Sequence, residues 1–187
     1  MEKSSIPHPA AGNGVFLRGS AVPGSFIGFH PGLVYLAKDV RKMLNYPNIS
    51  KDNCYLMSRY DSCILDAKDF NTDIQLPCGK RLNNPFACGH MINHPPPGSE
   101  PNVMAFNYDI RKTFPSELVY LVPNRYYREP GILFKTATVM RTIIFVATRH
   151  LNNEELFVNY RLNPSSKLPD WYTPVNLIED KRRWNAD

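Results

Sequence analysis

The stretch ACGHMINHPPPGSEPN, from Ala87 to Asn102, sets two asparagines and two histidines around three consecutive prolines. Proline fixes φ at about −65° and has no backbone N–H, so this segment is expected to be neither the interior of a helix nor an inner strand. It predicts a shaped loop that holds Asn93, His94 and Asn102 at fixed positions.

The whole chain has the composition of a globular protein. Its 187 residues are 43% hydrophobic and 21% charged, which is typical of a single domain with a packed core and excludes a disordered chain. The 17 prolines favour a fold rich in loops and strands. No run approaches the roughly 18 apolar residues of a membrane span, and the N-terminus has no apolar signal-peptide core. We therefore expect an intracellular monomer without a membrane partner.

The net charge of +5 is weak support for a nucleic-acid partner. The basic residues are scattered, apart from the cluster Lys181–Arg183, and no nucleic-acid-binding module is recognisable. Nucleic-acid binding is not expected as the main role.

The four cysteines lack the spacing of common metal sites. One group, formed by Cys78, Cys88, His90 and His94, carries four possible zinc ligands, but its spacing matches no common zinc finger. We expect buried or free thiols and no bound metal.

Short β-type runs dominate the secondary-structure pattern. The expected strands are VFL (15–17), SFIGF (25–29), CYLM (54–57), SCILDA (62–67), NVMAF (102–106), LVYLV (118–122), TIIFVAT (142–148) and ELFVNY (155–160). Three helices are expected. One follows an apolar stripe from Leu33 to Leu44, a second begins at Asn84-Pro85, and a third follows Thr173-Pro174.

Four motifs occur in a specific order: GNGVF (12–16), HPG (30–32), GHMINH with EPN (89–102), and IIFVATRHLNNEELFVNY (143–160). In this order they resemble the SET domain, the fold of the S-adenosylmethionine-dependent protein lysine methyltransferases. The resemblance implies a mainly β fold of several small curved sheets, with short helices and a pseudo-knot near the C-terminal motifs. It predicts a SET domain over residues 1–162 and a tail, 163–187, that packs on the site or closes it.

The resemblance also implies a cofactor site. S-adenosylmethionine would be held by Gly12, Asn13, Gly14, Asn93, His94 and Tyr160. Glycines let backbone come close to a ligand and adopt positive φ cheaply. Asn93 and His94 correspond to the family's Asn-His pair, and Asn102 would anchor the second side of the loop.

Tyr160 corresponds to the tyrosine at the end of the family's EELxxxY segment and is the expected catalytic residue. A target lysine must lose a proton before it can react, which costs about 4 kcal/mol at neutral pH. An apolar channel lowers a lysine pKa enough for the amine to lose its proton without a strong base. The role left for the tyrosine hydroxyl is to orient the amine.

The expected substrate channel is formed by His30, Phe106, Phe157 and Trp171. His30 stands where the family often has a tyrosine, and a plain strand-end histidine is an equal alternative. The PPPGSE segment is about three residues longer than usual. No cysteine follows Tyr160, so the zinc-binding segment of many family members is absent, and Trp171 and Tyr172 are expected to supply aromatic surface instead.

The residues and the resemblance together predict a methyltransferase whose partner is a protein or peptide with a target lysine. Two alternatives stay open: a non-catalytic SET-fold interaction module, and a methyltransferase with a non-lysine protein acceptor. Location is expected to be nuclear or cytoplasmic, with the nucleus slightly favoured by family analogy.

Overall fold

The computed structural model describes residues 1–75, 78–129 and 138–185. The chain forms two compact units, each built from separate stretches of sequence. Unit 1 contains Met1–Ser25, Met91–Met104 and Val146–Asp187, and unit 2 contains Phe26–His90 and Ala105–Phe145.

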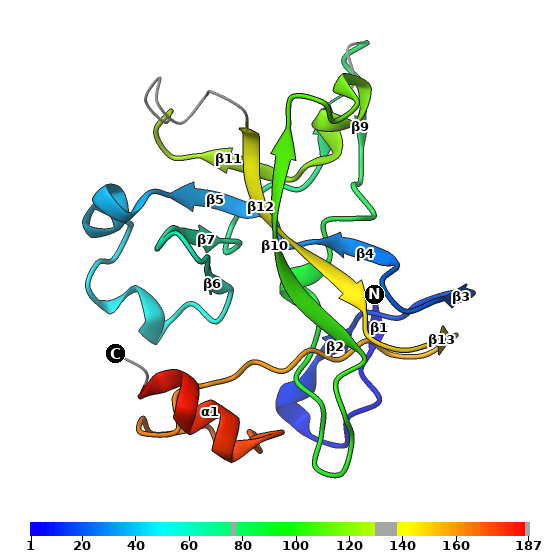
Figure 1. Cartoon of the computed structure of the whole chain (residues 1–187), viewed down its shortest axis with the longest axis vertical. Coiled ribbons are helices and arrows are strands. Elements are labelled where there is room, and N and C mark those ends of the chain that lie inside the picture. The colour runs from blue at the N-terminus through cyan, green and yellow to red at the C-terminus, as the bar shows by residue number, and fades with distance from the viewer. Residues whose placement is uncertain (76–77, 130–137, 186–187) are drawn as a thin grey trace. The chain divides into compact units, whose positions relative to one another are not determined.

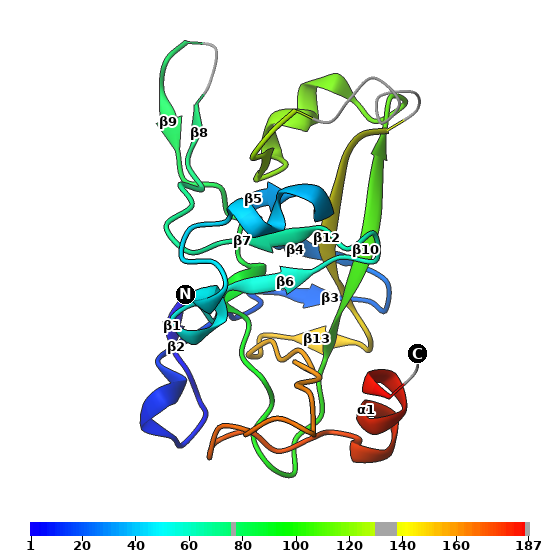
Figure 2. The same ribbon diagram turned by 90° about the vertical axis from the view of Figure 1, so that its left-hand side faces the viewer.

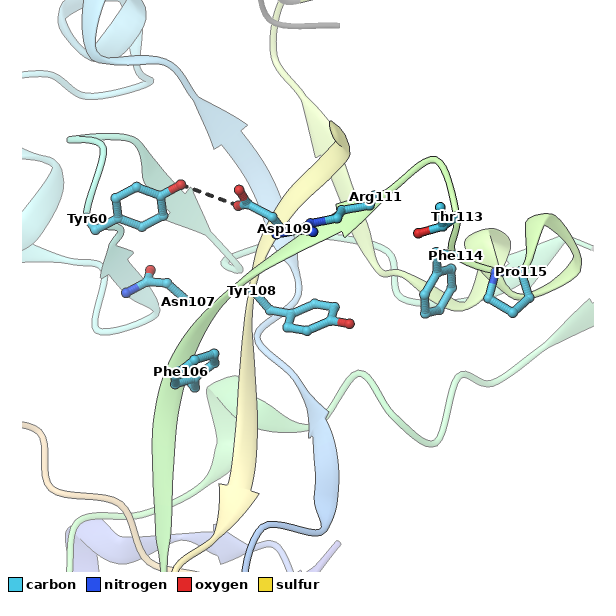
Figure 3. A pocket seen from close by; sticks show the side chains of 9 residues that line it. All are labelled: Tyr60, Phe106, Asn107, Tyr108, Asp109, Arg111, Thr113, Phe114 and Pro115. Atoms are coloured by element: carbon cyan, nitrogen blue, oxygen red, sulfur yellow. Dashed lines mark hydrogen bonds between the residues drawn. The ribbon is translucent and has the colours of Figure 1, made fainter. Parts of the chain in front are cut away.

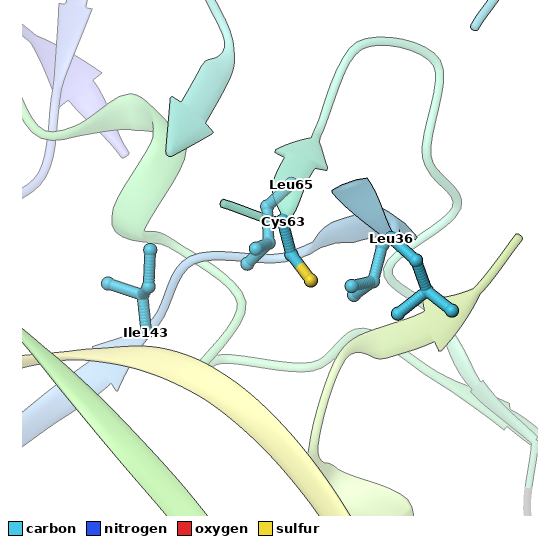
Figure 4. Close-up of a cluster of buried hydrophobic side chains, with 5 residues drawn as sticks. Leu36, Cys63, Leu65 and Ile143 are labelled. Atoms are coloured by element: carbon cyan, nitrogen blue, oxygen red, sulfur yellow. The ribbon is translucent and has the colours of Figure 1, made fainter. Parts of the chain in front are cut away.

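A four-stranded sheet organises unit 2 (Figure 1). Its order is β11 (Asn124–Tyr126), β5 (Gly32–Tyr35), β7 (Ile64–Asp66) and β6 (Leu56–Ser58). β11 runs parallel to β5, whereas β7 is antiparallel to both of its neighbours. A buried cluster packs here, formed by Val34, Leu36, Cys63, Leu65 and Ile143 (Figure 4).

A second sheet has the order β10 (Val103–Arg111), β12 (Thr138–Ala147) and β4 (Phe26–Phe29). β10 and β12 are the two long strands that lie next to each other in Figure 1, and β10 is at the edge of the sheet. Ile143, Phe145 and Ala147 of the central strand are buried, as expected for its apolar sequence. A two-stranded sheet, β8 (Ile74–Gln75) with β9 (Arg81–Leu82), completes unit 2 (Figure 2).

Unit 1 contains two short antiparallel pairs and one α-helix. β1 (Glu2–Lys3) pairs with β2 (Asn13–Gly14), and β3 (Ser20–Ala21) pairs with β13 (Leu151–Asn152). The helix α1 covers Leu177–Trp184. In the described residues, 3-10 helices occur at Pro9–Ala11, Ala37–Lys42, Asn48–Lys51, Gly89–Met91 and Ser116–Leu121. The predominance of small sheets confirms the expected mainly-β class.

The helix expected between Leu33 and Leu44 is wrong. The first half is β5, and the second half is the 3-10 helix Ala37–Lys42. The apolar pattern of this segment fits both a helix and a strand. β5 forms because it hydrogen-bonds to a strand on each side. Leu44, the last member of the expected stripe, is exposed.

Other expected elements are also wrong: VFL and ELFVNY contribute only isolated bridges, such as that between Phe16 and Glu155. Asn84 caps only a single turn, because its Oδ1 accepts a hydrogen bond from Phe86 N at 3.0 Å and no helix follows until the short Gly89–Met91 segment. LVYLV forms the 3-10 helix Ser116–Leu121 rather than a strand. The C-terminal helix is confirmed, but it begins at Leu177 with Asn176 as its N-cap.

Among residues 1–75, 78–129 and 138–185, no helix is long and apolar enough to cross a lipid bilayer.

Candidate functional site

The two ends of the proline loop hold the segment Glu155–Val158 between them, within unit 1. Val158 N donates to Asn93 O at 2.9 Å, and Asn102 N and Val103 N both donate to Phe157 O, at 3.0 and 3.1 Å. The Asn102 side chain, 1% exposed, adds three bonds: its Oδ1 accepts from Phe157 N at 2.7 Å, and its Nδ2 donates to Glu155 O at 2.7 Å and to Glu154 Oε2 at 3.0 Å. Asn102 therefore anchors the second end of the loop, while the threading of a pseudo-knot stays a prediction.

Asn93 lies against the glycine turn near the N-terminus. Its Nδ2 donates to Asn13 O at 3.1 Å and lies 3.4 Å from Ala11 O and from a carboxylate oxygen of Glu155. In the described part of the chain, no donor reaches Asn93 Oδ1. Gly12 has φ of +58°, and a Cβ there would meet no atom within 4 Å, so open space adjoins the turn.

Gly14 lies directly against a buried carboxylate. A Cβ at Gly14 would lie 2.0 Å from Glu155 Oε1, so glycine is needed to make room for a protein carboxylate. Glu155 is 5% exposed. Its oxygens accept from Ser4 Oγ and Ser5 N, both at 2.7 Å, as well as from Ser5 Oγ and Asn93 Nδ2. Sequence reasoning missed this carboxylate; the only signal was the Glu-Glu pair before the last expected strand.

His94 is buried and has a defined tautomer. One ring nitrogen, Nε2, lies 2.8 Å from Thr173 O, which can only accept, so Nε2 carries the proton. Nδ1 then accepts from Tyr160 N at 3.3 Å. Burial lowers the pKa of His94, although the bond to Thr173 opposes the shift. The imidazole is thus neutral near pH 7, and it joins the loop to the C-terminal tail.

Four aromatic side chains of unit 1 form a closed chain of ring contacts, here called the aromatic cluster: His94, Tyr160, Trp171 and Tyr172. Ring centroids are 5.5 Å apart for His94–Tyr160, 6.1 Å for Tyr160–Trp171, 6.0 Å for Trp171–Tyr172 and 4.4 Å for Tyr172–His94. The Tyr160 hydroxyl lies 3.0 Å from Ile92 O and donates its proton there. Tyr160 and Trp171 are 39% and 37% exposed, so the cluster is open to solvent on one side.

The tail is tied to the same region by hydrogen bonds. Leu162 N donates to the Tyr172 hydroxyl at 3.1 Å, and Trp184 Nε1 donates to Arg161 O at 2.9 Å. Trp171, expected in the channel, is thus near Tyr160. Phe157, also expected there, lies in the bridging segment, is half-buried and meets the loop through its backbone.

The other two expected channel residues, His30 and Phe106, belong to unit 2. His30 is 4% exposed, and its Nε2 lies 3.3 Å from Tyr55 O. Burial, and then the neighbouring His90, lower the pKa of His30 to about 4. Its Nδ1 has no partner among the described residues. His30 is therefore a neutral imidazole with one buried acceptor nitrogen.

Phe106 lines an open pocket of about 740 Å³ on the edge strand β10 of unit 2 (Figure 3). The pocket is lined by Tyr60, Phe106, Asn107, Tyr108, Asp109, Arg111, Thr113, Phe114 and Pro115. Tyr60 and Phe106 are 60% and 50% exposed. The Tyr60 hydroxyl donates to Asp109 at 3.3 Å, the one bond drawn in Figure 3. Phe106 is therefore a surface aromatic residue in this unit.

No metal centre is visible in residues 1–75, 78–129 and 138–185, where no three histidine, cysteine or acidic side chains come together as ligands would. The four cysteines are free thiols: Cys54 and Cys78 are exposed, Cys88 is half-buried, and Cys63 belongs to the core of unit 2.

The comparisons with known proteins find similarity among solved structures. No protein-family description and no curated protein sequence matches the chain. Among solved structures, it is similar to the crystal structure of a Plasmodium falciparum protein named as a "putative histone methyltransferase". The two are 15% identical, the match covers 83% of this chain and 90% of that one, and the TM-score is 0.41. A TM-score this low supports no conclusion about the fold or the function of this chain.

Proposed function

We propose that the chain is a SET-fold methyltransferase that binds S-adenosylmethionine in unit 1 and methylates a lysine side chain of a protein substrate. One observation carries the proposal. Three of the motifs that resemble the SET domain, namely the glycine turn, Asn93-His94 and the segment ending in Tyr160, lie far apart in sequence but share one hydrogen-bond network. An accidental resemblance would not require these segments to meet.

The residues around Asn93 fit the cofactor. Asn93 Oδ1 is an acceptor without a donor in the described chain, which suits an ammonium group, and Gly12 leaves open space beside it. The aromatic cluster offers ring faces, which favour a cation. S-adenosylmethionine, when bound, supplies a methyl group on a positively charged sulfur. Asn13, Gly12 and Gly14 would contribute backbone rather than side-chain chemistry, with Gly14 acting through Glu155.

Tyr160 would orient the substrate amine. In this role its oxygen would accept an N–H from a lysine, while its own hydroxyl proton is directed to Ile92 O. Loss of the lysine proton would then depend on apolar surroundings, which disfavour the charged ammonium. Trp171 and Tyr172 would exclude water on the tail side, so the tail is a working part of the site.

His94 supports the same arrangement as a neutral group. A protonated imidazole could not accept from Tyr160 N, and its charge would repel both a sulfonium and an ammonium group. The lowered pKa of His94 keeps this charge absent near neutral pH.

The first test is calorimetric binding of S-adenosylhomocysteine to the wild-type chain and to Asn93→Ala. We expect binding by the wild type and a loss of about tenfold or more in Asn93→Ala, since a buried polar contact to a charged group is worth about 1.5–3 kcal/mol. Asn152→Ala, at an exposed asparagine of unit 1, is the matched control. A folded wild-type chain that binds nothing would contradict the proposal.

A second candidate is a non-catalytic interaction module, and the pocket on β10 favours it. Exposed aromatic residues in a hollow are typical of binding surfaces. Failure of the folded chain to bind the cofactor would support the interaction module. If the cofactor binds, mass spectrometry of methylated peptides distinguishes lysine from a non-lysine acceptor.

A further inference from the structure

Strand β10 has one open edge in the part of the chain that the structure describes. It pairs with β12 on one side and with no strand on the other. Thr148 N, directly after β12, donates to Asn102 O at 3.0 Å, and Val103 N donates to Phe157 O at 3.1 Å. The C=O of Asn102 and the N–H of Val103 belong to one peptide group and point in opposite directions. The N–H of Val103 therefore points to the edge that faces away from β12.

This direction fixes which backbone groups of β10 are available. Backbone groups of successive strand residues point to alternate edges, so residues two apart share an edge. Beyond Val103, the N–H and C=O groups that point away from β12 belong to Ala105, Asn107 and Asp109. No strand of the described chain pairs with them.

The pocket of about 740 Å³ on β10 lies along this open edge (Figure 3). It is lined by four successive residues, Phe106, Asn107, Tyr108 and Asp109. Successive side chains of a strand point to opposite faces of the sheet, and Asn107 and Tyr108 extend to opposite sides of the ribbon in Figure 3. A hollow that touches both faces must run beside the strand rather than over one face. An extended chain in this groove would reach the available backbone groups.

The exposed face of β10 is apolar for an edge strand. Met104, Phe106 and Tyr108 share this face and are 45%, 50% and 40% exposed. Ala105, on the opposite face, packs against the core of unit 2. Natural edge strands are commonly protected from pairing by a lysine, a proline or an inward-pointing charge, and none of these occurs between Met104 and Tyr108. An unprotected apolar edge is a site where another chain can add a strand.

The available charge of the groove is positive. Asp109 is already bonded, because the Tyr60 hydroxyl donates to it at 3.3 Å and Arg141 Nε lies 3.6 Å away. Arg111 also lines the groove and is exposed. Among residues 1–75, 78–129 and 138–185, no acidic side chain forms an ion pair with Arg111. An acidic group on a partner would therefore find an available guanidinium here.

The charge of the whole unit agrees with that of the groove. Unit 2 contains fourteen lysine and arginine residues against nine aspartate and glutamate residues, whereas unit 1 contains eight of each kind. The entire net charge of +5 therefore belongs to unit 2. Such an excess attracts an acidic partner and disfavours a basic one.

We infer that the open edge of β10 binds an extended acidic peptide of a partner protein, which adds a strand beside Ala105–Arg111. The peptide backbone bonds to the three outward-pointing residues, its apolar side chains cover Phe106 and Tyr108, and one of its carboxylates pairs with Arg111. A single-stranded nucleic acid fits less well, because base stacking leaves the backbone groups unpaired and brings phosphates close to Asp109. The site does not depend on cofactor binding in unit 1.

Asn107→Pro tests the added strand. Proline removes an outward-pointing N–H that β12 does not use, so the sheet should remain intact. Asn107→Ala, the matched control, removes the side chain and keeps the N–H. The probe is a fluorescein-labelled peptide of alternating valine and glutamate, as long as Ala105–Arg111. Fluorescence anisotropy should show binding by the wild type, a loss of about tenfold in Asn107→Pro and little change in Asn107→Ala. Equal affinity of the two variants, or no binding by the wild type, would overturn the inference.

Arg111→Glu tests the charge preference. The wild type should bind the glutamate peptide more tightly than a peptide with lysine in place of glutamate, and Arg111→Glu should reverse this order. Arg125→Glu is the matched control, because it changes the net charge by the same amount at an exposed position outside the groove. It should keep the wild-type order. Reversal in both variants would show that the overall charge selects the peptide, which would contradict the pairing with Arg111.

Hydrogen exchange of the wild type decides if Asn107→Pro does not fold. Bound peptide should slow exchange of the amides of Ala105, Asn107 and Asp109, while those of Phe106 and Tyr108, which point to β12, stay unchanged. Absence of this alternation would contradict strand addition. Tighter binding of single-stranded oligothymidine than of the glutamate peptide would overturn the inference in favour of nucleic acid. A wild-type dimer in sedimentation that Asn107→Pro dissociates would overturn it in favour of a second copy of the chain.

Discussion

Gly14 and Glu155 depend on each other at the scale of single residues. Glu155 is a buried carboxylate that no cation neutralises within ion-pair distance in the described chain; four donors from Ser4, Ser5 and Asn93 stabilise it instead. Such charge-assisted bonds can replace the hydration that burial removes. They also immobilise the carboxylate, so it cannot move away from a larger residue at position 14. The donors Ser4 and Ser5 attach the N-terminal segment to the site.

Gly14→Ala should therefore lower the free energy of unfolding by about 1–3 kcal/mol, the cost of forcing a methyl group into a packed position. Unlike Gly12, Gly14 does not have positive φ, so backbone strain is not the reason. Chemical denaturation of a double-mutant cycle with Glu155→Ala tests this explanation. Most of the Gly14→Ala cost should disappear in the Glu155→Ala background; an equal cost in both backgrounds would show that the carboxylate is not the cause.

The residues of the candidate site were predictable to different degrees. Asn93, His94 and Tyr160 were expected because they occur in recognisable motifs, and in the structure Tyr160 N donates a hydrogen bond to His94. Glu155 was not, since its burial depends on contacts with chain segments far away in sequence. A carboxylate in a polar-looking segment carries no local signal that the folded chain will bury it.

At the scale of elements, a local sequence pattern predicts a strand or helix correctly when pairing with distant segments does not change its conformation. SFIGF and TIIFVAT coincide with β4 and β12. The pattern from Leu33 to Leu44 fails because β7 and β11 pair with both edges of Gly32–Tyr35, and a sequence pattern contains no information about such pairings. Helix α1 was expected after Thr173-Pro174 but begins at Leu177, and its orientation could not be predicted, because its apolar residues are not the ones it buries.

The N-cap of α1 can be tested as an element. Asn176 Oδ1 accepts from Glu179 N at 3.0 Å, and removal of such a cap costs about 1 kcal/mol of helix stability. Asn176→Ala should therefore accelerate hydrogen exchange of the α1 amides about fivefold while global stability changes little. Asn185→Ala is the matched control, because Asn185 closes the helix through its backbone N–H rather than its side chain. Equal exchange in the two variants would contradict a capping role.

At the scale of the whole molecule, titratable groups with lowered pKa values make stability sensitive to acid. The pKa of Asp61 is about 2; burial opposes this shift, and hydrogen bonding to Arg59 outweighs it. Hydrogen bonding to Arg149 lowers the pKa of Glu154 to about 2 as well. Stability from these carboxylates is present above their ordinary pKa values and is lost as pH falls towards 2. The buried His30 also destabilises the folded chain as pH falls, but at higher pH than these carboxylates.

His30 should dominate the loss of stability between pH 6.5 and pH 4. The unfolded chain takes up a proton at the ordinary pKa of 6.5, whereas the buried imidazole resists protonation down to about 4. Stability is thus complete above pH 6.5 and decreases as pH falls, by a total of about 3 kcal/mol for this one group.

Urea denaturation at intervals from pH 7.5 to pH 4 measures the slope of stability against pH. His30→Gln can still donate to Tyr55 O and should flatten this range, with His150→Gln, at an exposed position, as the matched control. If His30→Gln keeps the wild-type slope while the chain remains folded, other groups must carry the acid sensitivity.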